Sequence, residues 1–343
     1  MRALVCEGPG HVALRELPEP EPGPGEVVVR VESTLTCGTD LKLVRRGHPK
    51  VPFPTVLGHE FCGRVARVGE GAPFLPGERV TSAVTGACGE CRDCRDGRPN
   101  LCTTAFDHRV WGTWAECVRV PARIVSAGLL RVPESVTPSA AALLDPLASV
   151  LRGLSRLGPV EGRIALVLGA GPIALLFTVL LRRRGAARVV VAGRNAKRLA
   201  AQEAEGARTI AAGDGLAARV RDATDGHGAD LVVEATGDVS VAEESPAFAA
   251  RGGTVLFFAG LPREARLSVL AHRVHYDEVT LAGSFHYTAA EARDALALLS
   301  DGGVPVARLV TGEGTLEEHA AVFDRVARGD DMKVAFRPGS RGT

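Results

Sequence analysis

A chain of 343 residues, 45% of them hydrophobic, exceeds one typical hydrophobic core, so two domains are expected. The formal net charge is +1, and no basic stretch is interleaved with aromatic residues, so the composition gives no electrostatic case for nucleic acid or a membrane surface. The expected partner is a small molecule.

The N-terminus and the cysteines indicate a compartment. Residues 1–8 lack an apolar core of the length that a secretion signal needs, so a cytoplasmic protein is expected. Thiols stay reduced there, and the eight cysteines then favour metal binding over disulfides.

The first half of the chain, to about Pro146, has the pattern of a β-rich, barrel-like domain. Short strands with Gly/Pro turns are predicted at residues 27–31, 63–68 and 78–81. A proline-rich stretch over residues 18–24 reads as an extended surface connector.

A compact cysteine motif lies inside this half, in a charged loop that contains glycine. Its four thiols belong to Cys88, Cys91, Cys94 and Cys102. Four thiolates at this spacing can surround zinc tetrahedrally, and such a closed set leaves no open coordination position. The motif predicts a structural zinc, whereas unpaired surface thiols would be a redox liability.

A second set of possible ligands is scattered: Cys37, the His59-Glu60 pair and Asp145. Taken singly, each is more often a buried cysteine, a satisfied histidine or a capping aspartate. Thiolate, imidazole and carboxylate are nevertheless zinc ligands, and three protein ligands leave room for substrate. Only their occurrence together beside a nucleotide-binding pattern favours a catalytic site.

That pattern begins at residues 163–174, an apolar run that ends in a glycine turn and leads into a helix. The turn contains Gly169, Gly171, Pro172 and Ile173, and it would bring backbone N–H groups at a helix start against a pyrophosphate. Residues 164–181 carry no charge and approach the length of a membrane span, but the glycines and the proline interrupt them. A strand, a turn and a helix explain the stretch better.

Short apolar runs alternate with helical patterns through the rest of the second half. They lie at residues 187–192, 207–211, 230–234, 254–259 and 279–283. Such alternation predicts a doubly wound parallel α/β sheet. Thr236 and Gly260 follow two of these strands and should line the cofactor edge, and His286 and Tyr287 either reach the cofactor or a subunit contact or form a polar exit. Helices at 291–299 and 316–327 should pack back on the first half.

Cofactor preference depends on the end of the second strand of that sheet. NAD sites usually place an acidic residue there, whereas this chain has Gly193 followed by Arg194. An arginine without a neighbouring carboxylate favours a 2′-phosphate, with Lys197 or Arg198 as support. NADP is therefore preferred over NAD, unless these cations are simply the solvated face of the next helix.

Four motifs together resemble the zinc-dependent medium-chain dehydrogenases, the group of alcohol, polyol and threonine dehydrogenases. They are Cys37-Gly38-Thr39-Asp40, Gly58-His59-Glu60, the four-cysteine motif and residues 169–174, in the family's order over essentially the whole chain. The resemblance implies a GroES-like catalytic domain (1–148 with 285–343) and a Rossmann domain (149–284). It also implies catalytic zinc on Cys37, His59 and Asp145, with Glu60 as a supporting or exchanging ligand. Polyol and threonine dehydrogenases usually have Glu in place of Asp145.

The expected activity is reversible hydride transfer between a secondary alcohol, such as a polyol, cyclitol or sugar-like compound, and NADP or NAD. Thr39 is expected to accept the substrate proton, and His48 is either the end of the relay or a solvated turn residue. Two groups are candidates for the pocket or for the surface: Trp111 with Trp114, and Lys42 with Arg45 and Arg46. A homodimer or homotetramer is expected.

Two alternatives remain open: a threonine-type amino-alcohol dehydrogenase, and a zinc-free quinone-reductase-like or regulatory nucleotide-binding protein. A substrate panel separates the first from the expected activity, and metal analysis separates the second.

Overall fold

A computed structural model describes residues 1–47 and 51–340, and the chain divides into two compact units. The first contains residues 1–148 and 287–343, and the second contains residues 149–286. Each unit is described by itself. Among the described residues, no helix combines the length and the apolar character needed to cross a bilayer.

The first unit is built on antiparallel sheets, as its short strands and Gly/Pro turns predict. A three-stranded sheet has the order β2-β1-β4. Its strands are β1 (Arg2–Gly8), β2 (His11–Glu16) and β4 (Thr55–Val56).

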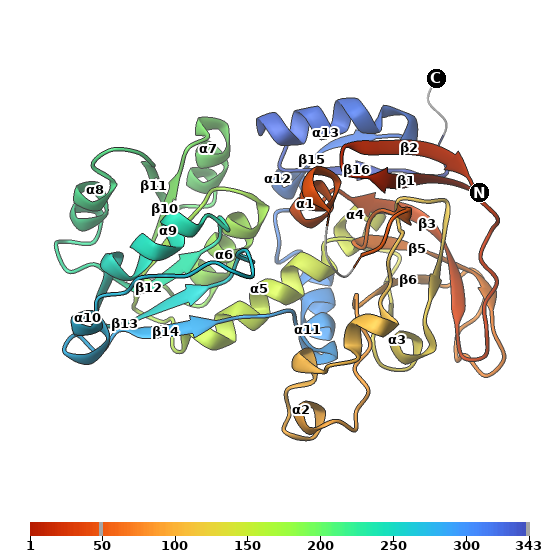
Figure 1. Cartoon of the computed structure of the whole chain (residues 1–343), viewed down its shortest axis with the longest axis horizontal. Coiled ribbons are helices and arrows are strands. Elements are labelled where there is room, and N and C mark those ends of the chain that lie inside the picture. Colours follow the sequence, from red (N-terminus) through yellow and green to blue (C-terminus); the bar gives the residue numbers. More distant parts are fainter. Residues whose placement is uncertain (48–50, 341–343) are drawn as a thin grey trace. The chain divides into compact units, whose positions relative to one another are not determined.

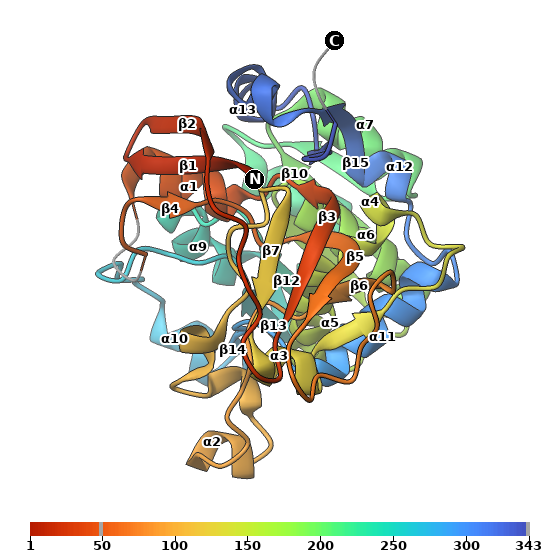
Figure 2. The same cartoon turned by 90° about the vertical axis from the view of Figure 1, so that its right-hand side faces the viewer.

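A larger seven-stranded sheet follows the path β15-β16-β3-β5-β6-β8, with β7 paired to β3; only β15 and β16 run parallel (Figure 2). Its strands are β3 (Val27–Leu35), β5 (Phe61–Val68), β6 (Arg79–Ser82), β7 (Cys117–Val120), β8 (Leu129–Arg131), β15 (Val310–Gly314) and β16 (Lys333–Phe336). The C-terminal end of the chain thus supplies a strand beside β3, which the sequence patterns do not predict.

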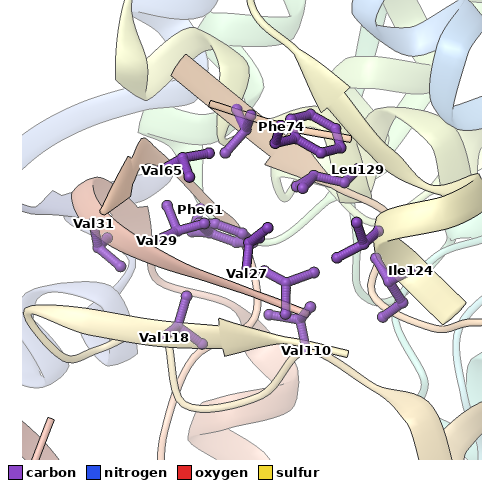
Figure 3. Close-up of a cluster of buried hydrophobic side chains, with 13 residues drawn as sticks. Val27, Val29, Val31, Phe61, Val65, Phe74, Val110, Val118, Ile124 and Leu129 are labelled. Atoms are coloured by element: carbon purple, nitrogen blue, oxygen red, sulfur yellow. The ribbon is translucent and has the colours of Figure 1, made fainter. Parts of the chain in front are cut away.

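A core of branched and aromatic side chains packs against this sheet (Figure 3). Val27, Val29 and Val31 alternate along β3 and therefore project from one face, where Phe61 and Val65 of β5 also lie. All five are at most 3% exposed. The β-branched residues thus serve both as strand formers and as core.

Short helices connect and cover these strands. They are α1 (Gly38–Arg46), α2 (Arg92–Arg95), α3 (Ala122–Ala127), α4 (Pro138–Ala141), α11 (Ala289–Ser300), α12 (Val306–Leu309) and α13 (His319–Arg328), with 3₁₀ turns η1 (Pro99–Leu101), η2 (Ala105–His108) and η4 (Leu316–Glu318). The longer helix α5 (Leu144–Leu157) begins in the first unit and ends in the second. The helices predicted in the tail correspond to α11, and to η4 with α13.

The second unit is a parallel six-stranded sheet with the order β11-β10-β9-β12-β13-β14 (Figure 1). Its strands are β9 (Ile164–Leu168), β10 (Arg188–Gly193), β11 (Arg208–Ala211), β12 (Ala229–Glu234), β13 (Ala249–Phe257) and β14 (Thr280–Gly283). Its helices are α6 (Pro172–Arg183), α7 (Ala196–Ala204), α8 (Leu216–Ala223), α9 (Val239–Glu244) and α10 (Ala271–His275), with the turn η3 (Ser245–Phe248).

This strand order is that of a doubly wound dinucleotide-binding fold. The order reverses between β9 and β12, where a crevice forms at the carboxyl ends of the strands. The glycine turn after β9 begins at this point. The predicted α/β class is therefore confirmed.

Candidate functional site

Three segments of the chain bring the scattered ligand candidates together. Cys37 is the N-cap of α1, Asp40 lies in its first turn, His59 and Glu60 directly precede β5, and Asp145 lies in the first turn of α5. In two overlapping sets, Cys37 with Asp40 and His59, and His59 with Glu60 and Asp145, the ligand atoms lie within 4.8 Å of one another. We call Cys37, Asp40, His59, Glu60 and Asp145 the His59 cluster.

The ring of His59 is fixed from several sides. Its Nδ1 lies 3.4 Å from Oδ2 of Asp40, whose other oxygen accepts the Gly58 N–H at 3.0 Å. Its Nε2 lies 4.0 Å from Oδ2 of Asp145. Trp111 stacks on the ring, with centroids 5.2 Å apart and planes 7° from parallel. Asp40 thus lies on the Nδ1 side of the ring, and Nε2 faces Asp145.

The charges of the cluster favour a cation. Burial lowers the pKa of His59, but the carboxylate of Asp40 and the thiolate of Cys37 outweigh it and hold that pKa well above its usual value. Oδ2 of Asp40 and Nδ1 of His59 are buried and make no well-aligned hydrogen bond. An anionic, buried set of sulfur, nitrogen and oxygen donors fits Zn²⁺.

Glu60 is paired with a buried lysine from the C-terminal strand β16. Nζ of Lys333 lies 2.8 and 2.6 Å from the two carboxylate oxygens of Glu60 and donates to the carbonyl oxygen of Thr36 at 3.0 Å. Burial lowers the pKa of Lys333, but the adjacent Glu60 carboxylate outweighs it and raises that pKa above its usual value. Both oxygens of Glu60 are therefore engaged by an ammonium group.

Asp145 is held by Tyr287. The Tyr287 hydroxyl donates to Oδ1 of Asp145 at 2.7 Å and accepts the Val84 N–H at 3.0 Å. Burial, and then the Asp145 carboxylate, hold the pKa of Tyr287 well above its usual value, so the phenol keeps its proton. Tyr287 therefore contacts the His59 cluster directly.

The four-cysteine motif forms a second cluster, which we call the cysteine lobe: Cys88, Cys91, Cys94 and Cys102. The four sulfurs lie within 4.8 Å of one another around α2, η1 and the turn that precedes them. Figure 1 labels α2. The N–H groups of Cys88 and Cys91 point at the sulfurs of Cys102 and Cys88, at 3.4 and 3.3 Å.

The thiols of the cysteine lobe titrate unevenly. Partial burial raises the pKa of Cys102, but the N–H of Cys88 and the hydroxyl of Thr104 outweigh it and lower that pKa to about 6. Burial and the neighbouring Cys91 raise the pKa of Cys94 to about 12. A dication at the centre would hold all four as thiolates, so the donor set fits a closed Zn²⁺ site.

The second unit places the predicted glycine turn at the N-terminus of α6. Gly169 has φ +115, and a Cβ there would lie 3.3 Å from the carbonyl oxygen of Ala235. A Cβ on Gly171, the N-cap of α6, would meet nothing within 4 Å, so that side of the turn is open to a ligand. Pro172 begins the helix without an unsatisfied N–H, and Ile173 follows. The arrangement fits a pyrophosphate.

The other cofactor candidates lie at the carboxyl end of this sheet. Gly193 is the last residue of β10, and Arg194 directly after it is exposed, as is Lys197 in α7. Arg198, half-buried in α7, donates its backbone N–H to the capping side chain of Asn195. Thr236 follows β12 and Gly260 follows β13, and both are exposed.

Glu234, at the end of β12, fixes the neighbouring turn. One of its oxygens accepts the N–H groups of Thr236 and Gly237, at 2.6 and 2.9 Å. Thr236 is therefore held at the strand end where the cofactor edge is expected.

Several predicted residues lie elsewhere or are not described. Trp114 is fully buried against Phe323 and Phe336, with its indole N–H on the carbonyl oxygen of Leu35, so it belongs to the core and not to a pocket wall. Thr39 is exposed in the first turn of α1, and His48 lies outside the described residues. Lys42, Arg45 and Arg46 are exposed on α1.

Sequence reasoning missed three residues that support the cluster. Asp40 stands in the same motif as Cys37, and its spacing to the helix start was a usable signal. Lys333 and Tyr287 carry no such signal, because each meets its partner only after the C-terminal part returns to the first unit. The local signal is weak: Lys333 is the charged residue of an otherwise apolar strand, Lys333–Phe336.

Comparison with known families agrees with this geometry. A family described as "Alcohol dehydrogenase GroES-like domain" matches residues 23–133, and one described as "Zinc-binding dehydrogenase" matches residues 172–301. The first matched segment falls in the antiparallel part of the chain, and the second covers most of the parallel-sheet part and continues through α11.

Individual relatives cover almost the whole chain. D-altritol 5-dehydrogenase from Agrobacterium fabrum is 35% identical over 98% of this chain and 99% of its own length. Sorbitol dehydrogenase from Halalkalibacterium halodurans is 32% identical over 98% and 99%. The NADP-bound crystal structure of a zinc-binding dehydrogenase from Sinorhizobium meliloti 1021 is 31% identical, covers 98% of this chain and 99% of its own, and superposes with a TM-score of 0.88.

Identity above 30% along the full length establishes common ancestry and not fold alone. The relatives are dehydrogenases, and the donor sets of this chain fit their metal. The chain therefore belongs to the zinc-dependent medium-chain dehydrogenases, enzymes that work with zinc and a nicotinamide cofactor.

Proposed function

We propose that the protein oxidises a secondary alcohol of a polyol, cyclitol or sugar-like substrate reversibly, with NADP as the preferred acceptor. The observation that carries the proposal is the His59 cluster, in which sulfur, imidazole and carboxylate ligand atoms lie within 4.8 Å of one another in two overlapping sets. The similarity to D-altritol 5-dehydrogenase and sorbitol dehydrogenase supports a polyol.

In this proposal Cys37, His59 and Asp145 hold the catalytic zinc. When bound, zinc acts as a Lewis acid that makes the substrate hydroxyl easier to deprotonate. Asp40 keeps His59 oriented with Nε2 towards the site. Glu60 remains paired with Lys333 and adds negative charge beside the site. It can bind the metal only if its ion pair with Lys333 breaks.

Thr39 is the proposed first proton acceptor. Its position two residues after Cys37, in the exposed first turn of α1, places a hydroxyl near the proposed ligands and within reach of solvent. His48 remains the proposed end of the relay.

A hydroxylated substrate also suits Trp111. Its indole N–H is buried and makes no hydrogen bond within the described residues, although the ring lies against His59. A buried donor without an acceptor is unfavourable, and a further hydroxyl of a polyol would satisfy it.

The cysteine lobe is proposed to hold a second, structural zinc. Four sulfurs leave no coordination position for substrate, and the charged loop around them contains little apolar surface that could order it otherwise.

The cofactor is proposed to bind along Gly169, Gly171, Pro172 and Ile173, with Thr236 and Gly260 at the same edge. NADP is preferred because no carboxylate stands at position 193 and Arg194 is exposed beside it. Lys197 and Arg198 are proposed to support the 2′-phosphate.

Steady-state kinetics with a substrate panel test the proposal. The panel contains D-altritol, D-sorbitol, D-arabinitol, L-threonine and a simple primary alcohol, each with NADP and with NAD. We expect kcat/KM for one polyol to exceed that for L-threonine by more than about tenfold, a difference of about 1.4 kcal/mol. The opposite order would favour amino-alcohol oxidation.

Metal analysis of the same preparation tests the zinc-free alternative. About two zinc ions per chain support the proposal, whereas about one, held by the cysteine lobe, supports a regulatory or quinone-reductase-like protein.

A homodimer or homotetramer is also proposed. Large apolar side chains are exposed on or near α10 and the edge strand β14: Leu270, Val274, Tyr276, Leu281 and Phe285. A second copy would cover this surface and the free edge. All eight cysteines are free of disulfides, which supports the proposed cytoplasmic location.

A further inference from the structure

Tyr287 lies at the point where the chain returns to the first unit, and its side chain is 3% exposed. It makes two hydrogen bonds through a single oxygen, one to Asp145 and one to the backbone of Val84. Neither partner is close to it in sequence.

The chemistry of the partners fixes the direction of both bonds. The Val84 N–H can only donate, so the phenolic oxygen accepts from it. The phenolic proton is then left for Oδ1 of Asp145, at 2.7 Å. Oδ1 of Asp145 is therefore the acceptor of this bond.

The other oxygen of Asp145 faces the metal candidates. Oδ2 lies 4.0 Å from Nε2 of His59, and Asp40 lies on the Nδ1 side of that ring. A tetrahedral zinc holds two such atoms about 3.4 Å apart, so both can bind one ion once they move closer by about half an ångström. The two oxygens of one carboxylate therefore have different partners: a tyrosine on one side and the ligand set on the other.

We propose that Tyr287 is a positioning residue for the metal: it holds Asp145 so that only Oδ2 is available as a ligand. The inference rests on the proposed function, in which Asp145 binds zinc. An aspartate has a short reach, and a partner that fixes one oxygen determines where the other one lies. The backbone bond to Val84 in turn fixes the phenol.

Tyr287→Phe tests this, because it keeps the buried ring and removes only the hydroxyl. Zinc transfer to an excess of a chromogenic chelator is followed over time for the full chain. We expect one of the two zinc ions to leave about 10- to 100-fold faster than in the parent, the range for loss of an outer partner of a ligand, while the second leaves at the parental rate. Tyr276→Phe is the matched control, since Tyr276 is the other tyrosine of the chain and is 64% exposed.

Cobalt substitution gives a readout that does not depend on turnover. The visible absorption of Co²⁺ reports ligand geometry, and we expect the catalytic-site bands to shift in Tyr287→Phe and to stay unchanged in Tyr276→Phe. Tyr287→His, whose ring can donate and accept, should restore part of the parental spectrum and metal retention. An unchanged spectrum together with parental zinc retention in Tyr287→Phe would overturn the inference.

Combination with Asp145→Asn separates a positioning role from a general effect on folding. If Tyr287 acts through Asp145, Tyr287→Phe adds little to the faster zinc loss of Asp145→Asn. Effects that multiply would show that Tyr287 acts elsewhere, for instance only through Val84, and would overturn the inference. Asp145→Asn alone reports on the ligand assignment: parental zinc retention in that variant contradicts the proposed ligand set itself.

Discussion

The cysteine lobe and the His59 cluster belong to the same unit, and both gather groups that bind zinc, yet they are constructed in opposite ways. The cysteine lobe takes all four ligands from residues 88–102. The His59 cluster draws on α1, the start of β5 and α5, and is supported by β16 and by Tyr287. A short loop can close a ligand set by itself, but an open site that must admit substrate is held in place by the surrounding fold.

The difference extends to the supporting residues. In the cysteine lobe, backbone N–H groups of the loop point at the sulfurs. In the His59 cluster three side chains have a partner that is distant in sequence: Asp40 for His59, Lys333 for Glu60 and Tyr287 for Asp145. Changes in the two clusters should therefore have separable consequences.

The largest expected effect is that of Cys37→Ser. Loss of a catalytic ligand should lower kcat/KM by more than about 10³-fold, several kcal/mol of barrier, because the proposed Lewis acid is lost or misplaced. Zinc content should fall from about two to about one per chain. Circular dichroism should show a retained fold, and full activity in a zinc-depleted variant would contradict the assignment.

Cys94→Ser in the cysteine lobe is the counterpart and the matched control. A closed thiolate site contributes folding free energy, so the melting temperature should fall while the remaining folded protein keeps its catalytic zinc. Calorimetry and metal analysis on the same sample check this. A variant that melts like the parent and keeps both metals would show that the lobe binds none.

Lys333→Met tests the support of the His59 cluster without removing a proposed ligand. It leaves the buried Glu60 carboxylate without its cation, which should cost about 3–5 kcal/mol of unfolding free energy, measured by urea denaturation. The double variant Lys333→Met with Glu60→Gln should recover much of that loss. Equal stability of Lys333→Met and the parent would mean that the pair is not formed in solution.

Arg194→Ala tests whether the cofactor preference depends on a short segment of the chain, as the ligand set of the cysteine lobe does. The substitution should weaken NADP binding by about 1.5–3 kcal/mol and leave NAD binding nearly unchanged. The ratio of the kcat/KM values for the two cofactors measures this. Arg221→Ala, at an exposed position of α8, is the control. If the parent prefers NAD tenfold, the assignment of NADP is wrong.

Gly193→Asp is a less clean version of the same test. A Cβ at position 193 would lie 2.6 Å from Cβ of Ala170 in the glycine turn, so the substitution would displace that turn as well as add a carboxylate. Arg194 projects from an exposed position and avoids the difficulty.

The smallest expected effect is on stability and concerns Glu116. Its carboxylate, directly before β7, accepts hydrogen bonds from Arg2 of β1. Burial raises the pKa of Glu116, but the N–H and guanidinium of Arg2 outweigh it and lower that pKa below its usual value. A depressed carboxyl pKa adds stability above the unfolded pKa of about 4.3, and this stability is lost as the pH falls. Glu116→Gln should be less stable by under about 1 kcal/mol at pH 7, and the difference should shrink as the pH falls through the lowered pKa of the folded state.

The sequence predicts best what is encoded locally. The cysteine spacing, the glycine turn and the alternation of strands and helices each depend on neighbours along the chain, and these features appear as expected. β16 and the burial of Trp114 were missed, because β16 forms against β3 and Trp114 packs against Phe323 and Phe336. Asp145 could be named as a ligand candidate from its residue type, but Tyr287 and Lys333 could not be assigned to the site, because each meets its partner only in the folded chain.

The pairing of β16 with β3 has a consequence for synthesis on the ribosome. Residues 149–286 emerge and can fold while the first unit still lacks its last strand. Until Lys333 is released from the exit tunnel, Glu60 has no cation and Tyr287 is only newly available to Asp145. The nascent protein can therefore complete its parallel-sheet unit before the His59 cluster gains the contact between Lys333 and Glu60, and loss of residues 332–343 would remove that contact while leaving residues 149–286 whole.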